Sequence, residues 1–132
     1  MQFRLLTLFV FAALVCVVAA GVGFVMSVYR IAIDAEDSLQ AFFKAYNPTI
    51  EFVEANNGAW PKSWDDLSAI APNNDYEWVA QHVEYDFDAD PAELARLTPG
   101  MFNAIKNKKR YYDFCLEIET LIDTLKRFHG PP

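Results

Sequence analysis

Alternate acidic side chains in the second half of the chain offer the oxygen ligands that a hard cation needs. Asp86, Asp88 and Asp90 have the spacing of the first ligands of an EF-hand Ca²⁺ loop. The chain has Pro91 where that loop requires glycine and Leu97 where it requires a bidentate glutamate, so the EF-hand interpretation fails. A looser Ca²⁺ site stays open as an alternative to a solvated acidic face, and its candidate ligands are Asp86, Asp88, Asp90 and Glu93.

Nucleophilic and general acid–base catalysis have little support in this sequence. The two histidines, His82 and His129, belong neither to a His-x-x-x-His zinc pattern nor to a triad with a Gly-x-Ser-x-Gly serine. Glu117 and Glu119 lie two positions apart on a predicted helix, so their carboxylates point to different faces and cannot share a proton. We therefore expect a protein that is not an enzyme, with no cofactor and no small-molecule substrate.

Two tryptophans flank a turn that a proline fixes. Trp60 and Trp64 lie on either side of Pro61. A tryptophan ring buries a large apolar area while its N–H reaches a hydrogen-bond partner. We expect the pair to form a lid on the helix that precedes it. The alternative is an aromatic pair that binds a sugar or a partner peptide.

One positive cluster interrupts an acidic chain. The sequence has 11 basic and 18 acidic residues, a net charge of −7, which argues against nucleic acid as a partner. We expect the cluster to lie in a solvated connection between helices. The alternative is that it docks an acidic partner, or the acidic strand of a neighbouring copy. The cluster comprises Lys106, Lys108, Lys109 and Arg110.

An uncharged apolar segment, residues 5–29, precedes all the residues discussed so far. Residues 5–29 contain no charged side chain and lie between Arg4 and Arg30. A helix of this length measures roughly 37 Å, more than the ~30 Å apolar thickness of a bilayer. We therefore predict a transmembrane helix whose partner is the lipid bilayer. Its membrane residues include Leu5, Phe9, Leu14, Val18, Val22 and Tyr29.

A cleaved signal peptide is the main alternative to a permanent anchor. A small-residue cleavage pattern ends at Ala20, but the apolar stretch exceeds the about 7 to 15 residues of a signal peptide core. Arg4 and Arg30 nearly balance the charge rule for orientation. The short segment before Arg4 favours an amino terminus inside the cell. We predict a single-pass signal anchor in the cell (inner) membrane, with the following domain outside the cytoplasm.

The membrane helix is expected to continue into the aqueous domain. Apolar residues recur every three or four positions over residues 31–57, which predicts one stripe of an amphipathic helix. Pro48 lies inside this stripe and predicts a kink, because the apolar phase is the same on both sides. An Asn-Asn-Gly sequence ending at Gly58 predicts the end of the helix. Ser63 predicts the cap of a short helix that begins at Trp64.

The next part of the chain carries a strand signal. Apolar and acidic residues alternate over residues 83–90, which predicts a strand with a solvated acidic face. Because one strand cannot make a sheet, residues 77–90 would form a hairpin, pair with another chain, or lie as an edge on the helix.

The carboxy-terminal third is expected to be helical. Prolines after capping residues predict short helices over residues 91–97 and 99–106. A broad apolar stripe that includes Leu121 and Phe128 predicts a last helix over residues 110–129, packed on residues 39–53. The thiol of Cys115, on this helix, is expected to be buried as a small apolar group.

These elements define a mainly α fold with minor β (α+β). Residues 1–30 form the predicted transmembrane signal anchor, and residues 31–132 form an acidic head outside the cytoplasm. Within the head, residues 31–57 continue the helix and residues 58–132 form the globular part, with one or two short strands. A head of this size has room for one modest core.

The order of these elements, together with one short motif, resembles a known family. The motif reads Gly-x-Trp-Pro-x-Ser-x-x-Asp-Leu over residues 58–67 and follows a hydrophobic amino-terminal helix. This arrangement resembles the pilins of type IV pili and the pseudopilins of type II secretion. The resemblance implies a long helix that opens into a globular head, with amino-terminal helices that pack into a filament. It does not extend to the family's processing glycine or to its glutamate early in the mature helix, because the first glutamate here is Glu36.

Two function classes follow. In the first, the protein is a non-enzymatic, membrane-anchored, pseudopilin-like structural or assembly subunit of a secretion machine. In the second, it is a membrane-tethered protein-interaction or regulatory module that does not polymerise. Both classes require protein partners or self-association.

Overall fold

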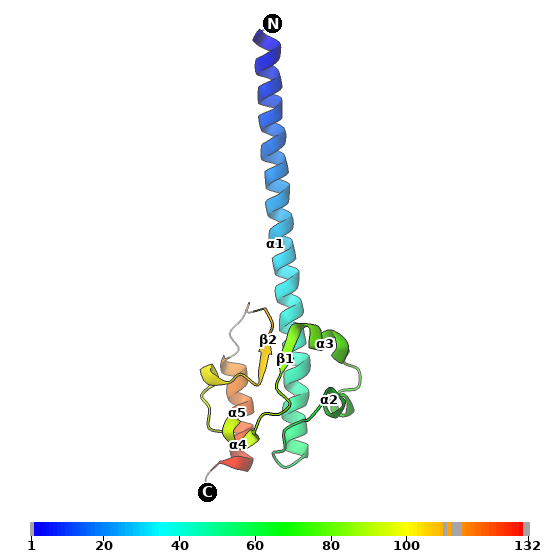
Figure 1. Cartoon of the computed structure of the whole chain (residues 1–132), viewed down its shortest axis with the longest axis vertical. Helices are drawn as coiled ribbons and strands as arrows, with labels where there is room; N and C mark the ends of the chain where they lie inside the picture. The colour runs from blue at the N-terminus through cyan, green and yellow to red at the C-terminus, as the bar shows by residue number, and fades with distance from the viewer. Residues whose placement is uncertain (1, 110, 112–114, 131–132) are drawn as a thin grey trace. The chain divides into compact units, whose positions relative to one another are not determined.

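The computed structural model describes residues 2–109, 111 and 115–130, without the side chains of residues 2–6, 115 and 116. It is mostly helical, with a long apolar amino-terminal helix and one small antiparallel sheet, so the predicted fold class is confirmed at this level. Figure 1 shows the arrangement. The elements are α1 (Gln2–Ala55), α2 (Trp64–Ile70), α3 (Tyr76–His82), β1 (Val83–Tyr85), α4 (Pro91–Leu94), η1 (Pro99–Met101), β2 (Ile105–Asn107) and α5 (Cys115–His129).

The helix α1 belongs to two compact units, residues 1–35 and residues 36–132. In the first unit, the large apolar side chains are exposed all along the helix. The exposed fraction is 71% at Leu8 and 42% at Ile33, and it is similarly high between them. The most apolar stretch of 18 residues has a mean hydropathy of 2.8, and none of it is buried. In length and composition α1 can therefore cross a membrane, a property that anchors and signal sequences share.

The helix runs without interruption through Pro48, as the unchanged apolar phase predicts. Proline has no N–H to donate to the carbonyl four residues earlier, which is that of Lys44. The side-chain amide of Asn74, in the turn between α2 and α3, donates to this carbonyl at 3.2 Å. The amide therefore replaces the hydrogen bond that the proline removes, and it fastens this turn to α1.

The core of the second unit forms between α1 and α5. Phe42, Val53 and Leu121 are fully buried in one hydrophobic cluster. The hydroxyl of Tyr46 donates to the carbonyl of Glu117. The predicted packing of the last helix on α1 is therefore confirmed.

The last helix departs from its prediction at both ends. It is described from Cys115, and the predicted start at Arg110 lies outside the described residues, as does the Cys115 side chain. At the other end the prediction for Phe128 is wrong, because this side chain is 41% exposed. Its position in the final turn of α5 places it beyond the elements that cover Leu125.

The end of α1 depends on a glycine, as predicted. Asn57 and Gly58 have φ values of 54° and 86°, the left-handed conformation that ends many helices. A Cβ on Gly58 would lie 2.4 Å from Cβ of Phe128 and 2.7 Å from Nε2 of His129. The imidazole of His129 donates to the Gly58 carbonyl at 2.7 Å. No other residue fits here, because α5 passes directly against this turn.

The next two helices are short and capped. Ser63 accepts a hydrogen bond from the Asp66 N–H at 3.4 Å, so the predicted cap of α2 is confirmed. The helix α3 was not predicted, because residues 77–90 were assigned to the strand and its possible partners. Asp75 caps it by accepting from the Trp78 N–H at 3.0 Å.

The two-stranded sheet joins segments that are distant in sequence. β1 pairs antiparallel with β2, with Val83 opposite Asn107 and Tyr85 opposite Ile105. The predicted hairpin within residues 77–90 is therefore wrong, and so is the strand without a partner in its own chain that lies as an edge on the helix. Pairing with another chain stays a prediction. The predicted helix over residues 99–106 is also wrong, since only η1 and then β2 form there.

The strand and the helix beside it are shorter than predicted. β1 ends at Tyr85, because the Asp88 N–H then donates to the Asp86 carboxylate at 3.0 Å and the chain turns away. The predicted alternation of burial nevertheless persists through residue 90, with the acidic residues exposed. α4 covers Pro91–Leu94, where a helix over residues 91–97 was predicted.

Candidate functional site

The acidic side chains of the candidate Ca²⁺ site do not converge. One carboxylate oxygen of Asp86 accepts from the Asp88 N–H at 3.0 Å, and one of Asp90 caps α4 by accepting from the Ala92 N–H at 2.9 Å. Glu93 lies in the first turn of α4 and is exposed. Within the described residues, no three His, Cys, Asp or Glu side chains are grouped so that they could hold a metal ion.

Trp60 serves as a buried connector. Its exposed fraction is 3%, and its indole N–H donates to the Asp86 carbonyl at 2.7 Å. Its ring stacks on Tyr85, with ring centres 5.5 Å apart. The predicted structural role, a large buried ring with a satisfied N–H, is therefore the one observed for Trp60, although its ring contacts β1.

Trp64 extends the same aromatic cluster towards the surface. It is half-buried and meets Tyr85 and Phe87 edge to face, with ring centres 5.3 and 5.0 Å away. Tyr85 lies at the centre, and its hydroxyl is 2.8 Å from that of Thr49 on α1. Burial raises the pKa of the Tyr85 phenol far above its usual value. These rings pack against one another, so the cluster joins β1, α1 and the turn before α2.

The basic cluster is not a connection between helices, because Lys106 lies in β2. Its ammonium is 3.4 Å from the carboxylate of Glu84, the residue opposite it in the sheet. The ammonium of Lys108 donates to the Ala80 carbonyl at 2.6 Å. Lys109 is exposed, and Arg110 lies outside the described residues.

A second positive group, which the sequence did not reveal, lies on α3 and beside it. We call it the Trp78 patch, and it consists of Lys44, Trp78, His82 and Lys108. The ammonium of Lys44 lies 5.0 Å from the centre of the Trp78 ring, within the range of a cation–π interaction. The His82 ring lies 4.6 Å from the Trp78 ring, and its Nδ1 is 3.0 Å from the Trp78 carbonyl. The helical cap at Asp75 was the sequence signal that could have placed Trp78 and His82 on one helix.

Both histidines contact the backbone. Nδ1 of His82 lies near the carbonyl of its own helix, and Nε2 of His129 contacts the carbonyl of Gly58. A polar hollow of about 270 Å³ lies beside the sheet, lined by Glu84, Asp86, Lys106 and two neighbours. The Glu84–Lys106 ion pair lies at this hollow, so its two opposite charges are already paired.

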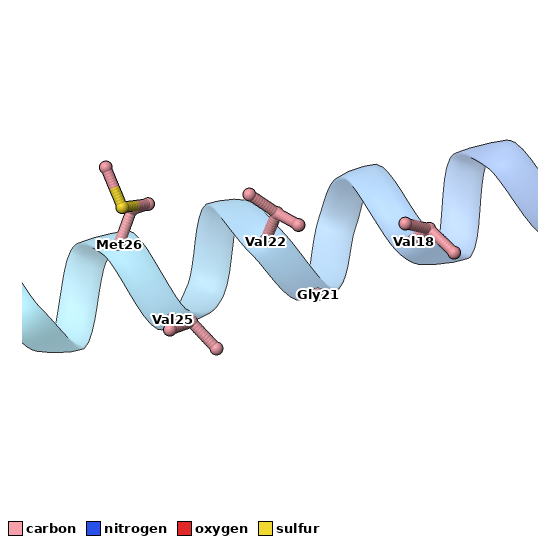
Figure 2. A pocket seen from close by; sticks show the side chains of 5 residues that line it. All are labelled: Val18, Gly21, Val22, Val25 and Met26. Atoms are coloured by element: carbon pink, nitrogen blue, oxygen red, sulfur yellow. The ribbon is translucent and has the colours of Figure 1, made fainter.

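The surface of the apolar helix is almost featureless. Figure 2 shows the residues of one shallow hollow on it, of about 360 Å³, which includes Gly21 in its lining. The predicted membrane residues Val18 and Val22 line it, together with Val25 and Met26. Gly21 contributes no side chain to this hollow, and a Cβ added there would meet nothing within 4 Å.

The predicted membrane residues share one environment. Those whose side chains the structure describes are all exposed on α1, and the Leu5 side chain lies outside the described ones. Comparison with protein-family models, with curated proteins and with solved structures gives no match to this chain.

Proposed function

We propose that this chain is a non-enzymatic, single-pass membrane-anchored subunit that acts by binding other proteins, with the architecture of a pseudopilin. One observation carries the proposal. The helix α1 exposes large apolar side chains from Leu8 to Ile33 and then buries one face, from Ser38 to Val53, in the core. Exposed apolar surface on this scale needs a covering, and its length matches a bilayer.

The non-enzymatic part of the proposal draws on the use made of the polar groups. His82 and His129 both contact backbone carbonyls, and the carboxylates of Asp86 and Asp90 accept backbone hydrogen bonds. The Tyr85 phenol is neutral and bonded to Thr49. These groups stabilise turns and helix ends, which is the work expected in a domain whose surface binds partners.

The proposed location is the cell (inner) membrane, with the head outside the cytoplasm. A carboxy-terminal fusion of the full chain to alkaline phosphatase, which folds only outside the cytoplasm, should be active. A matched fusion to a cytoplasmic fluorescent reporter should be dark. The reverse pattern would place the head in the cytoplasm and contradict this part of the proposal.

A tether that does not polymerise is the second candidate, and one observation favours it. The apolar segment of residues 5–29 contains no glutamate, although the pilin-like resemblance would place one early in this helix. A permanent anchor does not need this glutamate. The two candidates differ in the fate of the amino terminus.

Mass spectrometry of the amino terminus of the membrane-extracted protein tests this proposal. We expect the apolar segment of residues 5–29 to be retained. Cleavage near Arg4 would favour a filament subunit, and an intact chain would favour a tether. Cleavage after Ala20 would make the segment a signal peptide and contradict both. Replacing Ala20 with Leu, which blocks that small-residue site, is the control.

A further inference from the structure

We propose that the head carries a docking site for a second copy of this chain. The site is the Trp78 patch defined above. Its occupant is the acidic turn of the other copy, which consists of Asp86, Asp88 and Asp90. The inference rests on the proposed function in one respect, because two heads meet often only when both are held on one membrane.

The Trp78 patch is built by three elements, which fix the positions of its side chains. Asn74 holds α3 against α1 through the Lys44 carbonyl, and the Lys44 ammonium lies over the indole of Trp78. The Lys108 N–H donates to the His82 carbonyl at 2.8 Å, which places the end of β2 beside the end of α3. The Lys44 ammonium is therefore held over the half-buried Trp78 ring, and the Lys108 ammonium is held at the Ala80 carbonyl of the same helix.

The positive charge of this patch is not neutralised within the described chain. The ammonium of Lys44 contacts an aromatic ring, and that of Lys108 contacts a carbonyl. Neither forms an ion pair with a described carboxylate. In contrast, Lys106, Lys126 and Arg127 pair with Glu84, Asp123 and Glu54. Lys44 and Lys108 therefore keep the capacity to attract an anion.

The acidic turn has the complementary property. Asp86, Asp88 and Asp90 are all exposed, and they follow one another at alternate positions. Asp86 and Asp90 each use one carboxylate oxygen in a backbone hydrogen bond, which orients them and leaves the second oxygen available. The carboxylate of Asp88 has no hydrogen bond or ion pair with the described residues. The turn thus presents three exposed negative charges, of which those of Asp86 and Asp90 are oriented by hydrogen bonds.

The two surfaces lie at opposite ends of β1, so they cannot meet within one chain. His82 precedes the strand and Asp86 follows it, which separates their Cα atoms by about 13 Å. Figure 1 shows α3 adjoining β1 at one end of this strand. The neutral Glu84–Lys106 pair lies between the two surfaces. A contact between patch and turn is therefore heterologous, and it leaves a free surface at each end for another copy.

Charge complementarity favours a second copy over an anionic bilayer as the occupant. The whole chain has a net charge of −7, so a broad anionic surface would also meet its acidic side chains. A narrow acidic turn can contact the patch alone. At physiological salt the repulsion between net charges is screened beyond ~8 Å, whereas contacting charges still attract.

Charge reversal in the full-length protein tests this docking. One variant carries Lys44→Glu and Lys108→Glu, and a second carries Asp86→Lys and Asp88→Lys. Self-association is measured by energy transfer between labelled copies in vesicles of neutral lipid at 0.15 M salt. We expect each variant alone to associate about tenfold more weakly than the native chain. Mixed together, the two should form a heterodimer, because the reversed turn of one fits the reversed patch of the other.

A matched control separates docking from net charge. Lys62→Glu with Lys126→Glu makes the same charge change as the reversed patch at exposed positions, and it should leave association unchanged. Melting curves should show that all variants fold. Equal weakening in the control, absence of heterodimer in the mixture, or a native chain that stays monomeric would overturn the inference. Loss of binding to vesicles of anionic lipid in the patch variant, with self-association intact, would assign the patch to lipid instead.

The two proposals fail in different ways. If the variant with Lys44→Glu and Lys108→Glu associates as well as the native chain, this docking site is wrong and the proposed membrane subunit is unaffected. Cleavage after Ala20 would remove the membrane subunit, while the isolated contact between patch and turn could still be measured in the variants.

Discussion

Residues 8–33 and residues 38–53 belong to the same helix but differ in how their apolar side chains are covered. The first stretch is apolar on every side and exposed, whereas the second is apolar on one stripe and buried along it. A helix that is hydrophobic all round suits an apolar solvent, and an amphipathic helix suits a boundary between core and water. One continuous helix therefore serves both environments, and only the pattern of its apolar side chains differs between them.

The largest expected effect on stability comes from a charge in the core beside the second stretch. The substitution is Leu121→Asp, at a fully buried position on α5. An unpaired carboxylate there costs an amount comparable to the whole stability of a small domain. Circular dichroism of the purified full chain in detergent should show the second unit unfolded.

The matched change lies in the first stretch. Leu14→Asp should leave the melting of the second unit unchanged, because Leu14 has no contact with the core cluster. It should weaken membrane integration by about 3 kcal/mol, measured as a shift towards the soluble fraction.

Equal melting of native and Leu121→Asp proteins would refute the packing of α5 on α1.

The next effect concerns the turn that ends the core stripe. Gly58→Ala adds a Cβ that would lie 2.4 Å from Phe128 Cβ at a φ of 86°. The strain and the displaced α5 should cost about 2–3 kcal/mol of unfolding free energy in a urea titration. Gly100→Ala, where a Cβ meets nothing within 4 Å, should change it little. Similar losses in both variants would show that α5 does not pass against Gly58.

A smaller effect tests the proline inside α1. Asn74→Ala leaves the Lys44 carbonyl without its donor and should cost about 1–2 kcal/mol. In a Pro48→Ala background the helix regains its own N–H for that carbonyl, so the same Asn74 change should cost much less. Thermal melts of the four proteins form a double-mutant cycle. A cost that is equal in both backgrounds would mean that Asn74 acts elsewhere.

The smallest effect appears only in alkaline solution. Burial raises the pKa of the Tyr85, Tyr46 and Tyr76 phenols above the ordinary value of 10.0. Stability is therefore complete below pH about 10 and falls as pH rises further, since the unfolded chain loses phenol protons that the folded chain keeps. Tyr85→Phe should reduce this fall by about 1.4 kcal/mol per pH unit in urea titrations above pH 10. An unchanged slope would contradict the burial of this phenol.

Local patterns in the sequence predicted the elements that local physics decides. The unchanged apolar phase across Pro48 predicted one helix, and the Asn-Asn-Gly sequence predicted its end. Ser63 predicted the cap of α2. The sequence could not name Asn74 as the group that satisfies the Lys44 carbonyl, because the two residues are distant along the chain.

Long-range pairing explains the elements that were predicted wrongly. Alternation over residues 83–90 indicates a half-buried segment but not its partner, and β2, which pairs with it, follows only after α4 and η1. Lys106 read as the end of a helix because Thr98 and Pro99 start one, yet only η1 forms before the sheet. The Trp78 patch was missed for the same reason, since it joins Lys44 to α3 and to the end of β2.

Hydrogen exchange of the full chain in lipid nanodiscs, followed along α1 as urea increases, tests the central comparison most directly. We predict that amides of residues 38–53 lose protection together with α5, while those of residues 8–29 stay protected because lipid covers them. Loss of protection in both stretches at the same urea concentration would contradict the account. So would unprotected residues 8–29 in the absence of urea.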